Sequence, residues 1–289
     1  MHRHYLLQIL ILISGSTIAQ DKLPGLEGII VERFYTTGQK DCQTKYPEGN
    51  IPEGSVTYRI FLDLDSGYRF QAAYGSPDHA LVIKSDQPIY NHPEGGYTHP
   101  NIQPLRVLRK NTALLDSWLS VGAASENHIG IPRIYDHDGK DSLVNYEKGY
   151  FTNQPDKKSI PFNQADGMIR VEKPPYPTFF QIDSCLAGLG SVINRNELII
   201  QNGAWASLGK GTVGADSLTT NSVLIAQITT TGKLEFDLNI MIGTPDGESI
   251  RYVSQNPIKG ERLHPALHYS SEKSHRKERK KKNRKNKTV

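Results

Sequence analysis

The sequence predicts an all-β protein: an antiparallel β-sandwich formed by one large domain with long loops. Val56–Leu64 and Leu234–Ile242 alternate apolar and polar residues with the period of two that a β-strand produces. The 289 residues include 25 glycines and 17 prolines, which favours many turns between short elements. Only Leu105–Asp116 has apolar residues at a helical spacing, and that segment is short.

The chain opens with the three-part pattern of a secretory signal peptide over residues 1–19. Arg3 precedes the apolar run Leu6–Ser14, and small residues lead up to Ala19. The run is far shorter than the ~20 residues that span a bilayer, so we expect cleavage after Ala19 and no retained anchor. The sequence therefore predicts a secreted, periplasmic or cell-surface protein without a membrane span.

The first elements are expected to follow a short leader over residues 20–28, with the sandwich domain over residues 29–253. Ile29–Tyr35 is predicted as a strand and Asp41–Gly54 as a polar loop. On the polar face of Val56–Leu64, Phe61 is the one apolar residue. The turn after Leu64 and the renewed alternation from Tyr68 to Tyr74 predict a hairpin.

A second hairpin is predicted near the end of the domain. Asn221–Thr229 is almost continuously apolar, and a turn at Thr230–Lys233 leads into the alternating segment Leu234–Ile242. This pair indicates a central strand beside a more exposed neighbour. Three shorter strands are expected at Ala80–Lys84, Trp118–Val121 and Asn196–Gln201.

Two further features concern the surface and the core. Asn153–Met168 and Lys173–Pro177 are rich in proline and asparagine and predict a long surface excursion. Trp118 and Trp205 occur in similar short strings, and we expect each to fill one end of the β-core, where a large apolar ring fits best.

Charge divides the chain into a body and a tail. The formal net charge is +4, but Ser271–Val289 holds 10 basic and 2 acidic residues. Gln20–Ser270 therefore holds 23 basic and 28 acidic residues. A mildly acidic body carries a strongly basic tail, and the basic isoelectric point belongs to the tail.

The tail is expected to be disordered over residues 254–289 and strongly basic from residue 273. Such a segment binds envelope or extracellular polyanions by counterion release. Nucleic acid is not expected as a partner, because the segment has no interleaved aromatic residues and follows a secretion signal. The candidate polyanion-binding residues are Arg276, Lys277, Arg279, Lys280, Lys281, Lys282, Arg284, Lys285 and Lys287.

The two cysteines, Cys42 and Cys185, are a candidate disulfide, since exported proteins fold in an oxidising environment. A bridge between them would close a loop of ~140 residues and stabilise the fold by roughly 4–5 kcal/mol in the chain-entropy model. Cys185 lies in an apolar run, so a buried free thiol is the alternative.

The sequence holds no nucleophile elbow, zinc-protease motif, P-loop or dinucleotide-binding glycine pattern. Asp136, Asp138 and Asp141 form a weak candidate calcium site, because closely spaced carboxylates near a glycine resemble a calcium loop. The alternative is a solvated turn, since aspartate and glycine favour turns for backbone reasons. His92 and His99 lack a visible third ligand, so we interpret their segment as a structural loop. No cofactor other than Ca²⁺ is expected.

Several strings are similar to a family of secreted bacterial β-rich domains of poorly defined function, found in surface and secreted proteins of bacteria with type IX secretion. The strings are Val56–Leu64, Ile89–Gly96, Leu115–Gly122, Gln181–Ser191 and Asn221–Ile242. The resemblance implies an extracytoplasmic β-sandwich and no catalytic residues.

These observations favour an exported, non-catalytic surface or extracellular protein with a structural or adhesion-like binding role. Its expected partners are glycans, polyanions or surface proteins. Two alternatives stay open. One is an exported hydrolase of polysaccharide with unassigned carboxylates, since such pairs are defined by their separation in space. The other is a polyanion-binding protein that acts through its basic tail.

Overall fold

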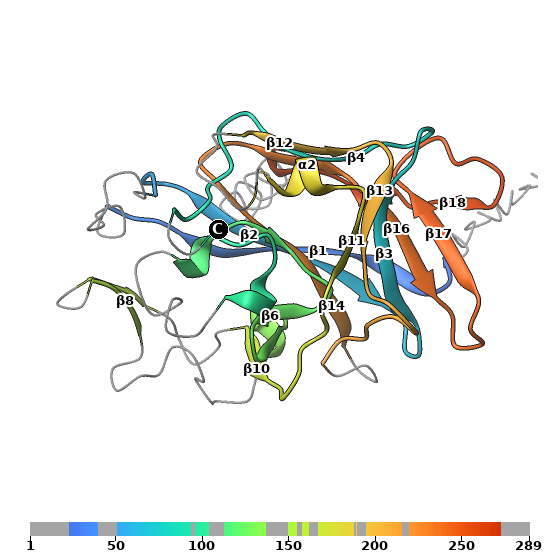
Figure 1. Ribbon diagram of the computed structural model, residues 1–289, viewed down its shortest axis with the longest axis horizontal. Helices are drawn as coiled ribbons and strands as arrows, with labels where there is room; N and C mark the ends of the chain where they lie inside the picture. The colour runs from blue at the N-terminus through green and yellow to red at the C-terminus, as the bar shows by residue number, and fades with distance from the viewer. Residues whose placement is uncertain are drawn as a thin grey trace, which may run out of the picture.

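The computed structural model describes residues 23–39, 51–93, 96–103, 113–136, 150–154, 158–161, 167–187, 189, 195–215 and 220–272. The architecture is all-β and almost entirely antiparallel, as the sequence predicted (Figure 1). Among the described residues, α-helix is limited to the single turn α2 (Asp183–Leu186) and to Ser271 and Glu272.

One layer is a four-stranded sheet in the order β1-β2-β14-β5. Its strands are β1 (Leu26–Thr36), β2 (Val56–Leu64), β14 (Asn221–Thr230) and β5 (Trp118–Leu119). All ten residues of β14 are buried, which agrees with the continuous apolar run and its predicted central position.

The opposite layer contains two sheets. The six-stranded sheet, in its spatial order, consists of β11 (Thr178–Phe180), β13 (Gly203–Ala206), β3 (Arg69–Gly75), β16 (Asn239–Gly243), β17 (Ser249–Val253) and β18 (Glu261–Leu263). The second sheet consists of β12 (Glu197–Ile200), β4 (Leu81–Ser85), β15 (Leu234–Asp237) and β19 (His268–Ser270). The pair β17–β18 is parallel.

The chain passes directly between these two sheets at three places. It does so from β3 to β4, from β12 to β13 and from β15 to β16, with Leu238 alone separating the last pair. The two sheets therefore form one bent layer. In Figure 1, β12 and β4 lie along the top and the six-stranded sheet lies at the right.

The main core lies between the two layers. Ile60 of the first sheet, Trp205 of the six-stranded sheet and Phe236 of the second belong to one buried apolar cluster. A second cluster, which includes Phe61 and Trp118, lies on the far side of the first sheet. Both tryptophans are fully buried, one in each cluster, as predicted.

The second cluster is covered by shorter elements. Met168 and Ala124 of this cover pack in the cluster, which shows how the outer face of the first sheet is closed. The elements are a three-stranded sheet of β6 (Ala123–Ser125), β7 (His128–Gly130) and β10 (Met168–Arg170), with the 3-10 turns η2 (Pro100–Ile102), η3 (Ala113–Leu115) and η4 (Arg133–Tyr135). A separate pair is formed by β8 (Tyr150–Gln154) and β9 (Lys158–Pro161).

Both faces of β2 are buried, although its alternation predicted a strand with one face on a core. Thr57 and Arg59, on the predicted polar face, have no exposed surface, and Phe61 beside them belongs to the second cluster. Phe61, the one apolar residue on the predicted polar face of β2, therefore indicated that this face is also buried.

Both predicted hairpins are wrong, because the two strands of each do not pair with each other. The strand β2 pairs with β1 and β14, whereas β3 pairs with β13 and β16. Likewise β14 pairs with β2 and β5, whereas β15 pairs with β4 and β19. In each case the chain crosses to the opposite layer after the turn, because both strands bury an apolar face against the core between the layers.

The domain also extends beyond its predicted limits. Strand β1 begins at Leu26, inside the expected leader. Residues 254–272, assigned to the tail, contain β18, the 3-10 turn η5 (Pro265–Leu267) and β19. Leu267 is fully buried in the main core, which ties this segment to the domain.

Other predictions concern segments that lie wholly or mostly outside the described residues. The signal peptide, most of the loop Asp41–Gly54 and the tail from residue 273 lie outside them. Most of the expected helix Leu105–Asp116 does too, and its end forms η3. Within the described residues, no helix is long and apolar enough to cross a membrane.

Candidate functional site

Of the three residues of the predicted calcium site, the structure describes Asp136. Asp136 follows η4, and its Oδ2 accepts a hydrogen bond from the backbone N–H of Gly167 at 2.7 Å. Asp138 and Asp141 lie outside the described residues, so their ligand set stays a prediction. Among the described residues no group of three or more His, Cys, Asp or Glu side chains could hold a metal ion.

Asp136 takes part in a buried ionic group that the sequence analysis missed. Burial raises the pKa of Glu32, and the nearby carboxylate of Asp136 raises this pKa further, while Arg59 and Arg133 lower it. Glu32 Oε1 accepts the backbone N–H of Arg133 at 2.7 Å. Both carboxylates thus accept backbone hydrogen bonds, and the group fastens η4 to β1. This arrangement is structural and gives no support to a pair of hydrolytic carboxylates.

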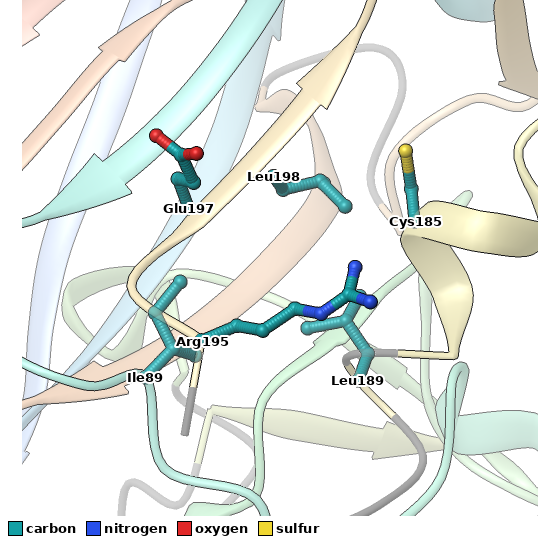
Figure 2. A pocket seen from close by; sticks show the side chains of 6 residues that line it. All are labelled: Ile89, Cys185, Leu189, Arg195, Glu197 and Leu198. Atoms are coloured by element: carbon teal, nitrogen blue, oxygen red, sulfur yellow. The ribbon is translucent and has the colours of Figure 1, made fainter. Parts of the chain in front are cut away.

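Cys185 is a free thiol that is partly exposed, and its Sγ donates to the carbonyl of Ile199 at 3.1 Å. Cys42 lies outside the described residues, so the disulfide stays a prediction. Figure 2 shows Cys185 at the rim of a pocket with Arg195 and Glu197. The cavity volume is about 10 Å³, room for about one water molecule and far below the ~300 Å³ at which small-molecule sites begin.

The two histidines singled out in the sequence belong to a structural loop, in agreement with the prediction. Asp116, fully buried, accepts the backbone N–H groups of His92 and Tyr97 at 2.7 and 2.8 Å. Burial raises the pKa of Asp116, against the backbone donors that favour its charged form. His99 instead packs against Tyr176, with ring centroids 4.7 Å apart.

A serine–histidine pair also exists, but it is inaccessible. Ser125 Oγ lies 2.7 Å from His128 Nδ1, and both residues are buried. Burial and the nearby Arg170 lower the pKa of His128 to about 4. A substrate cannot reach this pair, so it stabilises the turn between β6 and β7.

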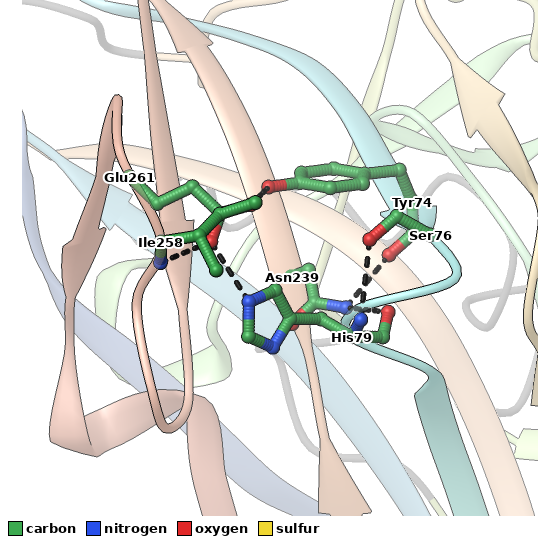
Figure 3. Close-up of polar contacts among 6 residues, drawn as sticks. All are labelled: Tyr74, Ser76, His79, Asn239, Ile258 and Glu261. Atoms are coloured by element: carbon green, nitrogen blue, oxygen red, sulfur yellow. Dashed lines mark hydrogen bonds and ion pairs between the residues drawn. The ribbon is translucent and has the colours of Figure 1, made fainter.

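A polar cluster joins the C-terminal segment to the rest of the domain (Figure 3). His79 Nε2 lies 2.9 Å from Glu261 Oε2, an ion-pair contact between two nearly inaccessible side chains. Tyr74 donates its hydroxyl to Glu261 Oε1 at 3.4 Å, and the backbone N–H of Ile258 donates to Oε2 at 3.1 Å. The side-chain amide of Asn239 donates to the backbone carbonyls of Tyr74 and His79 and so holds the chain between β3 and β4.

The outer face of the six-stranded sheet carries a group of exposed apolar side chains at its β11 edge. Phe179 and Trp205 face the core, so their neighbours on the two strands face outward. Thr178 lies opposite Ala206, and Phe180 opposite Ala204. Tyr176 and Leu208 lie two residues beyond these paired segments, and the Tyr176 ring packs against His99, whose ring also contacts the core-facing Phe179.

We call the exposed side chains at this edge the aromatic platform: Phe180, which faces outward beside Ala204, and Tyr176 and Leu208 in the segments that flank the two strands. Tyr176, Phe180 and Leu208 are 58%, 45% and 65% exposed. The Tyr176 hydroxyl lies 3.2 Å from His99 Nε2, and this contact holds the ring in place. Clustered exposed apolar side chains on a rigid sheet are typical of interaction sites.

Sequence reasoning missed this site because none of its residues belongs to a motif. The one available signal was the aromatic cluster Tyr176–Phe180, in and beside a segment predicted as a surface excursion.

No protein-family model, curated protein or solved structure matches this chain. The family resemblance noted in the sequence therefore stays a prediction, and the geometry of the platform carries the functional argument.

Proposed function

We propose that this chain is an exported, non-catalytic binding protein that attaches to glycans of the cell surface or extracellular matrix through the aromatic platform. The observation that carries the proposal is the exposure of Tyr176, Phe180 and Leu208 at the β11 edge of the six-stranded sheet. Sugar rings present apolar C–H faces, and these stack on aromatic side chains that also bear a polar group. Ala204, which lies opposite Phe180, is small and leaves room for a sugar ring beside the phenyl ring.

The rigidity of the platform supports the same role. Thr178–Phe180 is held by β13, and β13 is held in turn by β3. Side chains on paired strands need little ordering on binding, so less of the interaction free energy is lost. The buried Ser125–His128 pair and the backbone-bonded carboxylates of Glu32 and Asp136 favour binding over hydrolysis.

The test is retention of the full mature chain on insoluble polysaccharides, including cellulose, chitin and peptidoglycan, in about 0.5 M salt to screen the basic tail. Tyr176→Ala with Phe180→Ala should reduce retention at least about tenfold. The matched control is Tyr135→Ala with Ile199→Ala, two exposed side chains elsewhere, which should retain wild-type binding. Absence of retention by the wild type, or steady release of reducing ends, would overturn the proposal.

A second candidate function rests on the charge difference between body and tail. The 10 basic residues of Ser271–Val289 favour binding of an external polyanion, in addition to the platform. Replacing Lys280, Lys281 and Lys282 by glutamine should lower the salt concentration at which heparin releases the protein. An unchanged release point would exclude this role for the tail.

A further inference from the structure

We infer that the glycan bound by the platform is acidic, and that Arg69, Lys210 and Arg251 bind its carboxylate or sulfate groups. This inference rests on the proposed function and adds the chemical class of the ligand. The three residues are called the cationic group below.

The strand register places the cationic group on the outer face. Along β3, Phe70 and Ala73 face the core, and Gln71 is the extra residue of a bulge. Arg69 and Ala72, opposite Gly243 and Met241, therefore face outward.

The same reasoning applies to the neighbouring elements. On β17, Tyr252 faces the core, so Arg251, opposite Met241, faces outward. Lys210 is exposed in the turn after the platform residue Leu208. A Cβ built on the next residue, Gly211, would lie 3.2 Å from Arg69 Cβ, which places this turn over Arg69.

The side chains of the cationic group have no hydrogen bond or ion pair within the part of the chain that the structure describes. The sheet β12-β4-β15-β19 differs. Lys84 lies 3.3 Å from Glu235, His268 lies 2.9 Å from Asp237, and Lys233 pairs with Glu272. The fold thus pairs the cations of one sheet and leaves those of the platform face available.

Two of the three carboxylates around this face are bound by other residues. Glu261, at the level of Arg251, is paired with His79, and its side chain is only 3% exposed. Asp246 lies in the turn beyond β16 and is bound by the Thr244 hydroxyl. Glu248, in the same turn, is exposed and lies one residue before β17. The outward rows of the sheet itself carry exposed positive charge.

The spacing of the strands sets the size of the ligand. Strands lie about 4.8 Å apart, so β3 is about 10 Å and β17 about 19 Å from β11. A ligand that stacks on Phe180 and also reaches Arg251 must therefore be a chain that crosses the strands. Arginine binds carboxylate and sulfate groups through two parallel hydrogen bonds, which suits repeated acidic groups.

The test compares binding of the full mature chain to polygalacturonate and to the same polymer after reduction of its carboxyl groups, by titration calorimetry. The substitutions Arg69→Gln, Lys210→Gln and Arg251→Gln together should weaken binding of the acidic polymer by about tenfold or more and leave the neutral polymer unaffected. The control replaces three exposed cations elsewhere, Arg170, Arg195 and Lys259, by glutamine. This control has the same net charge and the same tail, and should bind as the wild type does.

The possible failures are distinguishable. If the wild type binds neither polymer and is retained on no polysaccharide of the panel, the proposed function fails; if it is retained on the panel but binds neither polymer, only the inference of an acidic ligand fails. If it binds both equally, only the inference of an acidic ligand fails. Equal losses in the two triple variants would assign the preference to overall charge and overturn the inference. Binding of polyglutamate as tight as that of polygalacturonate would overturn it in favour of an acidic peptide.

Discussion

At the scale of single residues, the fold depends on polar groups buried between its layers. Arg59 has no exposed surface, donates to Gln227 Oε1 at 2.9 Å and to the Gly167 carbonyl at 3.2 Å, and covers the Phe34 ring at 3.6 Å. Gln227 in turn donates to the carbonyls of Leu114 and Asp116. These contacts join the first sheet to the elements that cover it.

Replacing Arg59 by alanine should destabilise the protein by about 2–5 kcal/mol, because the acceptors it satisfies would stay buried without a donor. Lys84→Ala is the control: its ion pair with Glu235 is exposed and contributes within about 1 kcal/mol. Urea denaturation followed by tryptophan fluorescence measures both. A loss below 1 kcal/mol for Arg59→Ala would contradict its structural role.

His128 should make the fold sensitive to acid. Its pKa is lowered from 6.5 to about 4, so the folded state binds fewer protons than the unfolded chain between these values. The stability it contributes is complete above pH 6.5 and is lost as the pH falls towards 4, by up to about 1.4 kcal/mol per pH unit.

The buried Asp116, whose pKa is raised, acts in the opposite direction, so the test is a difference between variants. His128→Gln should be less stable than the wild type at pH 7, and the gap should narrow by pH 4.5. A gap that stays constant over this range would contradict the assignment. The measurement is the urea midpoint at each pH.

At the scale of elements, the sequence identified most strands but not their partners. Alternation located Val56–Leu64 and a continuous apolar run located Asn221–Thr229 nearly to the residue, because such apolar patterns are local properties of the sequence. Pairing is not local. A turn such as Thr230–Lys233 connects strands of one sheet or of two, and only the core between the layers decides which.

Short strands in polar surroundings were harder to predict. The strands β18 and β19 have three residues each, and their neighbours are mostly exposed. Their place in the fold depends on distant contacts, such as that of His264 Nε2 with the Leu26 carbonyl at 3.0 Å. No sequence pattern records such a contact.

Gly75 marks the place where the chain leaves the six-stranded sheet for the second one. A Cβ at this position would lie 1.8 Å from the carbonyl oxygen of Ile200, so the two chain segments must separate. Gly75→Ala should therefore destabilise the fold by about 2 kcal/mol or more. Gly28→Ala, in β1, meets nothing within 4 Å and should be close to neutral. Thermal denaturation of the two variants tests this contrast, and equal melting temperatures would refute it.

At the scale of the whole molecule, the C-terminal segment completes the bent layer and carries the tail. The Glu261 cluster holds it, since the carboxylate accepts contacts from three different parts of the chain. No sequence pattern indicates this cluster, because its members are spread from Tyr74 to Glu261.

Glu261→Ala should cost about 2–4 kcal/mol and speed proteolysis between residues 254 and 263, because buried partners lose their acceptor. Glu272→Ala removes only an exposed ion pair with Lys233 and should have little effect. Limited proteolysis with mass spectrometry distinguishes the two. An unchanged cleavage rate in Glu261→Ala would show that the cluster does not hold the segment.

The candidate site could be predicted only in its general class. Composition and the signal pattern predicted an exported β-rich binding protein. The platform was not predicted, because it depends on the pairing of β11 with β13, two strands that are not adjacent in the sequence. Phe180 and Ala204 become neighbours only through the register of β11 with β13, which depends on the core contacts of Phe179 and Trp205.

The most direct test of the central claim, that the outer face of the six-stranded sheet binds glycan, is a methyl NMR titration of the mature protein labelled at alanine. With a glycan retained in the binding panel, the alanine methyl signals should shift at Ala204, which lies opposite Phe180, as the ligand is added. Those of Ala124 and Ala226, buried in the two core clusters, should not. Shifts confined to alanines outside the platform would contradict the account, because they would place the ligand on another surface.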